Sequence, residues 1–451
     1  MIHKLESKSN DIDIFQPGAA SDTVVISFGG VNGRFEFYGS LSKLDVDFVL
    51  VRDPTKRWYQ HGLQDLEGGF QGLIKYLREL ITEREGKKIV VVGASAGGFA
   101  AILFGSLLNA DQIISYGPQT YISDELRAPL NERRWWPELK KITELHYGDL
   151  LPVVSSSLQS KVHIFFGSDD FFDFLHAAHL IECPNVTISM IENGDHGVSG
   201  TMKRDGLLIP SLECGIGQQD GLFPGVYLNK GEVGRNLVSG LIQGELPLNQ
   251  ETLREVKSIW PMITGVDFML GKQYMQGGDF QSAADIYKRI AYRELFSNFV
   301  FMSQIDLGFC LQKTGDYIES EALFKKAEQR KPFSQGVLIS YARLLSELGR
   351  YDEAEALLFR CVIHNPNYIG GYYALALVLI ECKKPKMAID CLIKARDLGA
   401  SLKHIDTLLL KLYLDSKNKL QAHRLINNIK AKDSVPAYLD SLERMQKEAV
   451  V

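Results

Sequence analysis

The residues that most clearly suggest chemistry form a glycine-flanked serine motif, Gly93-Ala94-Ser95-Ala96-Gly97. The β-branched run Ile89-Val90-Val91-Val92 precedes it and predicts a strand that is buried on both faces. Small and apolar residues follow from Ala100 at helical spacing. A serine at such a strand–turn–helix junction is pushed clear of the sheet, and its hydroxyl becomes a nucleophile when a base accepts its proton. A glycine-rich turn that packs tightly or holds a phosphate is the alternative.

The acid that a serine nucleophile needs is predicted after a second strand, at residues 161–166. A carboxylate there would hold an imidazole in the tautomer that accepts the serine proton. Asp170, in Gly167-Ser168-Asp169-Asp170, is our first choice for this role, and Asp173 is the second. Asp173 opens a predicted helix, so it could instead be an N-cap that accepts backbone N–H bonds.

The base is predicted after a third strand, at residues 186–191, where Gly194-Asp195-His196-Gly197 begins a loop. The carboxyl ends of parallel strands meet at one edge of a sheet, so we expect Ser95, the acid and His196 to lie together. The chain order is then serine, aspartate, histidine. A histidine that only forms part of a turn is the alternative.

Acyl transfer also needs backbone N–H donors for the negative charge that develops on the carbonyl oxygen. Ala96, directly after the serine, is expected to supply one of these donors. The other is expected from Gly29 or Gly30, which follow the predicted strand at residues 23–28. Glycines at this position allow the backbone to approach a substrate closely.

A further loop, after the predicted strand at residues 45–51, is rich in basic and aromatic residues. Arg52 or Arg57 would bind an anionic group, and Trp58 and Tyr59 would stack on a sugar or another ring. Equally, these aromatic rings could plug the domain surface. The segment Arg133-Arg134-Trp135-Trp136 has the same two interpretations.

The elements that must position these residues alternate between strands and helices over residues 20–212. Such alternation predicts a mostly parallel sheet with helices on both faces. With the motifs above, this segment resembles the α/β-hydrolase family. The resemblance implies a three-layer α/β domain that hydrolyses an ester, thioester or amide through an acyl-serine, without a metal or organic cofactor. The short stretch between Tyr116 and Lys161 implies a minimal lid. The expected substrate is a small-molecule or glycan ester.

A repeat replaces this alternation in the second half of the chain. Gly278, Gly315 and Gly349 each open a similar stretch, with a small residue five positions later and a large one nine positions later. This pattern resembles the tetratricopeptide repeat, with glycine at the turn between helices and small residues where the helices cross. The resemblance implies an all-α solenoid whose groove binds a peptide or a partner protein, or an array that serves dimerisation or scaffolding. The first interval, from Gly278 to Gly315, is the longer one and predicts a longer loop between helices.

These patterns divide the chain into three predicted parts. Residues 1–213 form the α/β-hydrolase domain, residues 214–254 a glycine-rich connector, and residues 255–451 the tetratricopeptide repeat domain. The net charge is −5, and basic residues are mixed with acidic ones along the sequence. The sequence therefore indicates no basic surface for a nucleic acid partner. No apolar run is long enough for a membrane span or a signal peptide. The six scattered cysteines favour free thiols in a reducing compartment, so a cytoplasmic location is expected.

The leading hypothesis is a cytoplasmic serine hydrolase of the esterase type, fused to a repeat module that binds a protein partner or self-associates. Acyl transfer would use the same residues with an acceptor other than water. The alternative from another class is a non-catalytic binding or assembly protein built on a degenerate hydrolase fold.

Overall fold

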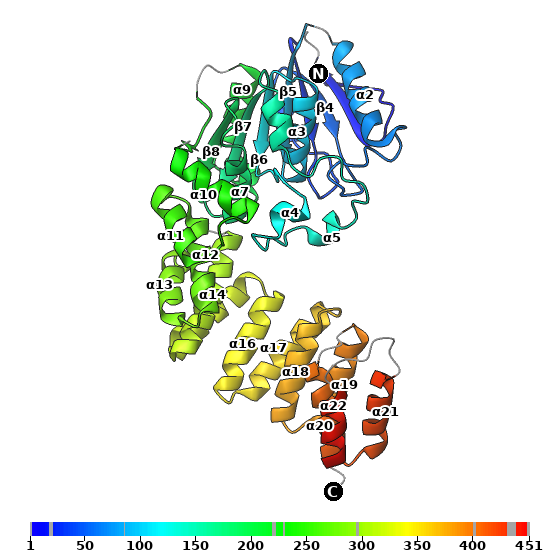
Figure 1. Ribbon diagram of the computed structural model, residues 1–451, viewed down its shortest axis with the longest axis vertical. Coiled ribbons are helices and arrows are strands. Elements are labelled where there is room, and N and C mark those ends of the chain that lie inside the picture. The colour runs from blue at the N-terminus through cyan, green and yellow to red at the C-terminus, as the bar shows by residue number, and fades with distance from the viewer. Residues whose placement is uncertain are drawn as a thin grey trace. The chain divides into compact units, whose positions relative to one another are not determined.

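The computed structural model describes residues 2–17, 21–84, 86–218, 222–228, 231–294, 297–399, 403–430 and 439–448. The chain divides into two compact units (Figure 1). The first comprises residues 1–279 with 294–299, and the second comprises residues 280–293 with 300–451. The first unit contains the sheet, and the second is built from helices.

The sheet of the first unit is mixed, and its described strands have the order β1-β2-β4-β3-β5-β6-β7-β8-β9. Neighbours from β4 to β8 pair in parallel, whereas the pairs β1–β2, β2–β4 and β8–β9 are antiparallel. The antiparallel strands at the two edges were not expected from the sequence. The strands are β1 (Ile2–Leu5), β2 (Ile12–Pro17), β3 (Thr23–Phe28), β4 (Asp47–Val51), β5 (Lys88–Ala94), β6 (Gln112–Tyr116), β7 (Lys161–Gly167), β8 (Val186–Ile191) and β9 (Val226–Tyr227).

Helices cover both faces of this sheet, as two close contacts show. A Cβ added at Gly105 of α3 (Ala96–Leu107) would lie 2.6 Å from the Ile113 side chain. A Cβ added at Gly215 of α9 (Leu208–Ile216) would lie 2.1 Å from the Ile114 side chain. Successive side chains of a strand point to opposite faces, so α3 and α9 lie on opposite sides of β6. The result is a three-layer α/β arrangement around the sheet.

The remaining helices of the first unit are short or lie at its periphery (Figure 1). The segment between β6 and β7 contains three short helices, consistent with its length. Besides α3 and α9, the helices described before the repeats are α1 (Tyr38–Leu41), α2 (Gly69–Thr82), α4 (Asp124–Arg127), α5 (Trp136–Leu139), α6 (Leu151–Ser156), α7 (Phe171–His179), α8 (Val198–Arg204), α10 (Glu232–Gln243), α11 (Gln250–Ile259) and α12 (Thr264–Gln276).

The predicted connector at residues 214–254 is largely helical where it is described. It contains the end of α9, all of α10 and the beginning of α11, while residues 219–221 and 229–230, including Gly221, lie outside the described residues. Leu237 and Leu241 of α10 are buried one turn apart, and α10 packs against α7 and α4. The many glycines of this segment hide an amphipathic pattern, which places it in the first compact unit. The boundary between the units follows α12, not residue 254.

The second unit has the helix pairs that the repeat predicts (Figure 1, green to red). Gly315 and Gly349 have positive φ angles of 91° and 74° at the turns within pairs. The small residues Ser320 and Ala354 are fully buried where the helices cross. The described helices are α13 (Phe280–Ala291), α14 (Asn298–Thr314), α15 (Tyr317–Arg330), α16 (Gln335–Glu347), α17 (Tyr351–His364), α18 (Ile369–Glu381), α19 (Pro385–Asp397), α20 (Lys403–Asp415), α21 (Lys419–Lys430) and α22 (Leu439–Glu448).

The longer first interval has two sources in the chain. The α13–α14 connection spans residues 292–297, of which 295 and 296 lie outside the described residues. In addition, α14 has 17 residues, whereas α16 has 13.

Candidate active site

Ser95 lies at the sharp turn between β5 and α3, in the unusual backbone conformation φ 55°, ψ −122°. A Cβ at Gly93 would lie 2.0 Å from the Gly97 carbonyl oxygen, and one at Gly97 would lie 2.2 Å from the Phe28 carbonyl oxygen. Only glycine fits at either position. The strained turn therefore depends on the two glycines that flank the serine motif.

The serine, the histidine and one aspartate form a continuous hydrogen-bonded relay. Ser95 Oγ lies 2.9 Å from His196 Nε2. His196 Nδ1 lies 2.9 Å from both Asp173 Oδ1 and Asp173 Oδ2. Ser95 follows β5, Asp173 lies in the first turn of α7 after β7, and His196 follows β8. The register of the parallel strands brings these three ends to one edge of the sheet.

The two candidate acids have exchanged the tasks expected of them. Asp170, our first choice, is the N-cap of α7, and its Oδ1 accepts a hydrogen bond of 2.9 Å from the Asp173 amide. The carboxylate that faces the imidazole belongs to Asp173, the second choice. The ranking of the two acids is corrected accordingly. An aspartate directly before a helix is a preferred N-cap, and that signal could have assigned Asp170 to the cap.

Burial and neighbouring charges shift the pKa values of the relay residues in opposite directions. Burial alone lowers the pKa of His196, but the charge and hydrogen bond of Asp173 outweigh it, and the pKa is raised above the ordinary value. For Asp173, burial raises the pKa, and the charges of His196 and Arg134 more than offset this, so its pKa is lowered. The aspartate is thus held as a carboxylate beside the imidazole.

Arg134 is the residue of this site whose role sequence reasoning missed. Its Nη1 donates to Asp173 Oδ1 at 2.8 Å and to the two carboxylate oxygens of Asp170 at 3.0 and 3.1 Å. Its Nε donates to Glu132 Oε1 at 2.8 Å, and Glu132 faces the buried His176 at 3.3 Å. Burial raises the pKa of Asp170, and Arg134 offsets this only in part. The arginine therefore neutralises a buried acidic cluster, and it is not among the residues that line the cavity beside Ser95.

The backbone N–H groups that we expected as oxyanion donors differ in their hydrogen bonding. Ala96 is the first residue of α3, where helix geometry leaves the backbone N–H without a partner in the helix. The Gly29 amide donates to the Val51 carbonyl at 2.8 Å and is therefore engaged within the fold. Gly30 lines the cavity beside Ser95, and the Glu36 carboxylate lies against its backbone. Of the expected donors, the Ala96 amide has no partner within its helix, whereas the Gly30 amide can donate to a ligand only in place of its hydrogen bond to the Glu36 carboxylate.

The predicted substrate-binding loop after β4 supports the fold instead. Trp58 and Tyr59 are each 1% exposed, so their rings offer no surface for a ligand. Tyr59 donates to the Gly29 carbonyl at 2.8 Å, and Arg52 pairs with Asp11 at 2.9 Å. This burial agrees with the alternative interpretation, in which the two aromatic rings fill the surface of the domain. Their packing holds the backbone of the Gly29 loop in place.

A cavity of about 410 Å³ opens above the relay. Ser95, His196 and Gly30 lie in its wall, together with Glu36 and Lys203. Trp135 also lines it, with its ring centroid 5.7 Å from that of His196. The cavity thus combines Ser95 and His196 with two charged side chains and the aromatic rings of Phe37 and Trp135.

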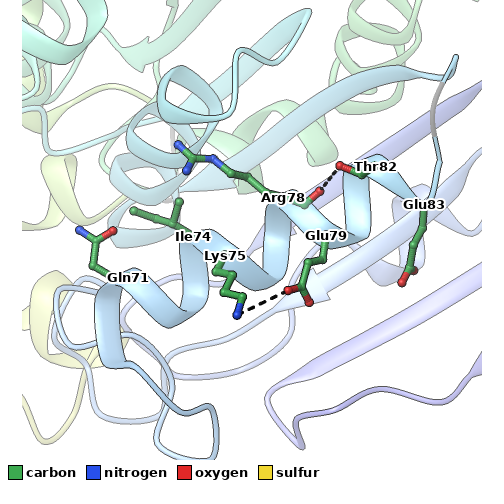
Figure 2. Close-up of a pocket in the computed structure, with 7 residues that line it drawn as sticks. All are labelled: Gln71, Ile74, Lys75, Arg78, Glu79, Thr82 and Glu83. Atoms are coloured by element: carbon green, nitrogen blue, oxygen red, sulfur yellow. Dashed lines mark hydrogen bonds and ion pairs between the residues drawn. The ribbon is translucent and has the colours of Figure 1, made fainter.

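Figure 2 shows a second hollow, of about 600 Å³, along the outer face of α2. Its lining residues belong to this single helix or, in the case of Glu83, to its C-cap, and Lys75 and Glu79 face one another across one turn. No side chains from different elements converge there, so this hollow is not a candidate for catalysis.

Two groups of side chains have the spacing of metal ligands among the described residues. One is Asp170, Asp173 and His196, where Arg134 already supplies the positive charge. The other is Asp352, Glu355 and Cys382 in the second unit, where Lys384 Nζ lies 2.7 Å from Glu355. A metal ion at either place would have to compete with the side-chain cation that is present.

Comparisons with known proteins identify the repeats. Residues 311–377 match the tetratricopeptide repeat family model, which confirms this part of the repeat prediction. The comparison with curated proteins gives no match.

Three solved structures illustrate what the chain is similar to. MamA from Desulfovibrio magneticus RS-1 is 18% identical, with 41% of this chain and 96% of that chain covered and a TM-score of 0.33. TTC0263, a thermophilic tetratricopeptide repeat protein of Thermus thermophilus, is 20% identical, with 42% and 98% covered and a TM-score of 0.33. PilF from Pseudomonas aeruginosa is 18% identical, with 42% and 84% covered and a TM-score of 0.35.

Among the described residues, every helix is too short or too polar to cross a bilayer.

Proposed function

We propose that the chain is a serine hydrolase that cleaves a carboxylic ester through an acyl-serine intermediate, and that its first unit has the α/β-hydrolase fold. The observation that carries this proposal is the relay from Ser95 through His196 to Asp173, in which both links measure 2.9 Å. Nucleophile, base and orienting acid within hydrogen-bond distance are the arrangement that activates a serine.

The reaction follows from this geometry in two steps. Ser95 Oγ attacks the ester carbonyl carbon while His196 Nε2 takes the serine proton, and Asp173 stabilises the imidazolium that forms. The backbone N–H of Ala96 faces the developing oxyanion, with Gly30 as the second donor. Collapse of the tetrahedral intermediate breaks the ester C–O bond, and His196 returns the proton to the leaving alcohol. Water, activated by His196, then releases the acid from the acyl-serine; an acyltransferase would use an acceptor hydroxyl instead.

Covalent labelling tests this proposal directly. A fluorophosphonate should modify the wild-type protein at Ser95, identified by peptide mass, and should leave Ser95→Ala unmodified. Hydrolysis of p-nitrophenyl acetate should fall by about 10³-fold or more in Ser95→Ala and His196→Ala. A wild-type protein that resists the probe, with p-nitrophenyl acetate cleavage unchanged in Ser95→Ala, would contradict the proposal.

A second candidate function is supported by the tetratricopeptide match at residues 311–377. Stacked repeats of this kind present a surface for a protein partner or for a second copy of the chain. In the alternative proposal this is the whole function, and the sheet unit is a non-catalytic platform. Sedimentation of the purified protein separates self-association from partner binding, and an unlabelled Ser95 would leave the interaction role as the function. A cytoplasmic location, which the cysteine pattern indicates, remains part of the proposal.

A further inference from the structure

The cavity above Ser95 contains a carboxylate that the proposed reaction does not use. Glu36 lies in the loop between β3 and α1, is half-buried and lines the cavity with Ser95 and His196. Its Oε1 accepts a hydrogen bond of 2.7 Å from Asn32 Nδ2. A Cβ at Gly30 would lie 3.3 Å from Oε1 and 3.6 Å from Oε2, so the carboxylate rests against the Gly30 backbone. It therefore lies in the wall of the same cavity as Ser95, against the backbone of the second expected oxyanion donor.

The negative charge of Glu36 has no partner ion in the part of the chain that the structure describes. Its contacts are the Asn32 amide and the Gly30 backbone, and both favour the charged form. Burial has the larger effect and raises the pKa of Glu36 above the usual value. The other ionisable groups of the cavity are His196 and the exposed Lys203. A substrate that displaces water from this cavity must therefore provide a positive charge for the Glu36 carboxylate.

This charge also lies where the reaction develops negative charge. The oxyanion of the tetrahedral intermediate needs the Gly30 amide, against which the Glu36 carboxylate rests. Two negative charges a few ångströms apart in a partly desolvated cavity repel each other strongly. A simple neutral ester leaves this repulsion in place. A substrate cation beside Glu36 removes it and draws the carboxylate away from the Gly30 amide.

We propose that Glu36 is the specificity-determining residue of this cavity and selects esters that carry a positively charged, ammonium-type group. The inference rests on the proposed hydrolase function and names its substrate class. Anionic esters are rejected because they would bring a second negative charge to the same wall. Neutral esters are cleaved slowly because nothing compensates Glu36 in the transition state.

Three acetate esters of similar size test the role of charge. They are 2-(trimethylammonio)ethyl acetate, its uncharged isostere 3,3-dimethylbutyl acetate, and the anionic 2-sulfonatoethyl acetate. For the wild-type protein, kcat/KM should be highest for the cationic ester, by about tenfold over the neutral one, and lowest for the anionic one. In Glu36→Gln, the ratio of cationic to neutral ester should fall toward one. The kcat/KM for the neutral ester should rise in this variant, since the repulsion is gone.

The matched control is Glu192→Gln, which removes the same charge from an exposed residue of the loop that carries His196. Glu192 does not line the cavity, so the ratio of cationic to neutral ester should stay at its wild-type value. Glutamine at position 36 keeps the side-chain shape and an oxygen that can accept from Asn32. Its thermal unfolding midpoint should therefore match the wild type, and a fluorophosphonate should still modify Ser95.

The outcomes separate this inference from the function on which it rests. If Ser95 is labelled and esters are cleaved, but the wild type shows no preference for the cationic ester, the inference is overturned and the hydrolase function stands. An equal preference in wild type and Glu36→Gln overturns it as well. If Ser95 is not labelled and none of the three esters is cleaved, the proposed function fails and the inference fails with it.

Discussion

Asp170 and Asp173 lie three residues apart at the start of α7, and each carboxylate faces a different group. Asp170 caps the helix and pairs with Arg134, while Asp173 faces the imidazole of His196. The order of residues along the chain cannot separate them, because both follow the same strand. Their directions from the helix start decide which one reaches the loop that carries His196.

Replacement of Asp173 should therefore affect catalysis far more than replacement of Asp170. In Asp173→Asn the imidazole loses the partner that fixes its tautomer, and we expect kcat to fall by about 10⁴-fold. Asp170→Asn keeps a good helix N-cap and should lose less than about tenfold. Steady-state kinetics on one ester measures both. Equal losses in the two variants would contradict the assignment of the acid.

The raised pKa of His196 predicts the direction of the pH dependence. The base is active when the imidazole is neutral, so kcat/KM should fall as the pH drops through the His196 pKa, at a pH above the ordinary histidine value of 6.5. In Asp173→Asn this acid limb should move to lower pH, since the charge that raises the pKa is gone. A pH–rate profile of kcat/KM for the two proteins measures the shift, and a limb that stays in place would exclude His196 as the base.

At the scale of elements, the segment between β6 and β7 is attached to α7 by buried polar contacts. Arg134 and Glu132 of this segment reach Asp173 and His176 of α7. The Thr120 amide also donates to His176 Nδ1 at 3.1 Å. Burial raises the pKa of Glu132, but the charges of His176 and Arg134 outweigh it and lower the pKa strongly. The segment over the site is thus fixed to the helix that supplies the acid.

Removal of the Arg134 charge should loosen this attachment. Arg134→Gln leaves buried carboxylates without a cation, and we expect a loss of about 3–5 kcal/mol in the free energy of unfolding. Arg134 also lowers the pKa of His196, so the acid limb of the pH–rate profile should move to higher pH. Urea denaturation and the pH profile measure the two effects.

Arg133→Gln is the matched control, because Arg133 is exposed and contacts only Asn131 and the Trp136 ring among the interactions described. Its unfolding free energy should change by about 0.5 kcal/mol or less. Similar losses in both arginine variants would show that the Arg134 cluster has no special role.

At the scale of the whole molecule, the helices after the sheet belong in part to the first compact unit. Trp260, after α11, packs its ring 5.0 Å from that of Phe174 in α7. The Gly265 amide of α12 donates to the Ser168 carbonyl at 2.9 Å, and Thr264 bonds to Asp169. These contacts reach the loop between β7 and α7 that precedes Asp173.

A chain cut at the boundary predicted from the sequence should therefore be less stable than one cut at the boundary between the units. A fragment of residues 1–254 lacks Trp260 and α12, and its loss of this packing should cost about 3–5 kcal/mol relative to residues 1–279. Urea denaturation of both fragments, with fluorophosphonate labelling of Ser95, measures the difference. Equal stability and equal labelling would show that α12 is not part of the unit.

Local patterns were sufficient wherever the physics is local. The strands at 23–28 and 186–191 are at the expected residues because an unbroken β-branched or apolar run has few other stable conformations. The repeat glycines Gly315 and Gly349 are at turns with positive φ, which other residues rarely adopt. The helices of residues 214–254 were not predicted, because the glycine content obscured their apolar face. Burial of that face becomes favourable only when it packs against α7 and α4.

The sequence by itself determined the strand-end positions of Ser95 and His196 and the helical repeats of the second half, since each depends on spacing along the chain. Only the tertiary structure decided which aspartate faces the imidazole, that Arg134 neutralises the acids, and that Trp58 and Tyr59 are buried. The physical reason is that these properties depend on distances between residues far apart in the chain. Packing sets those distances, and no local pattern encodes them.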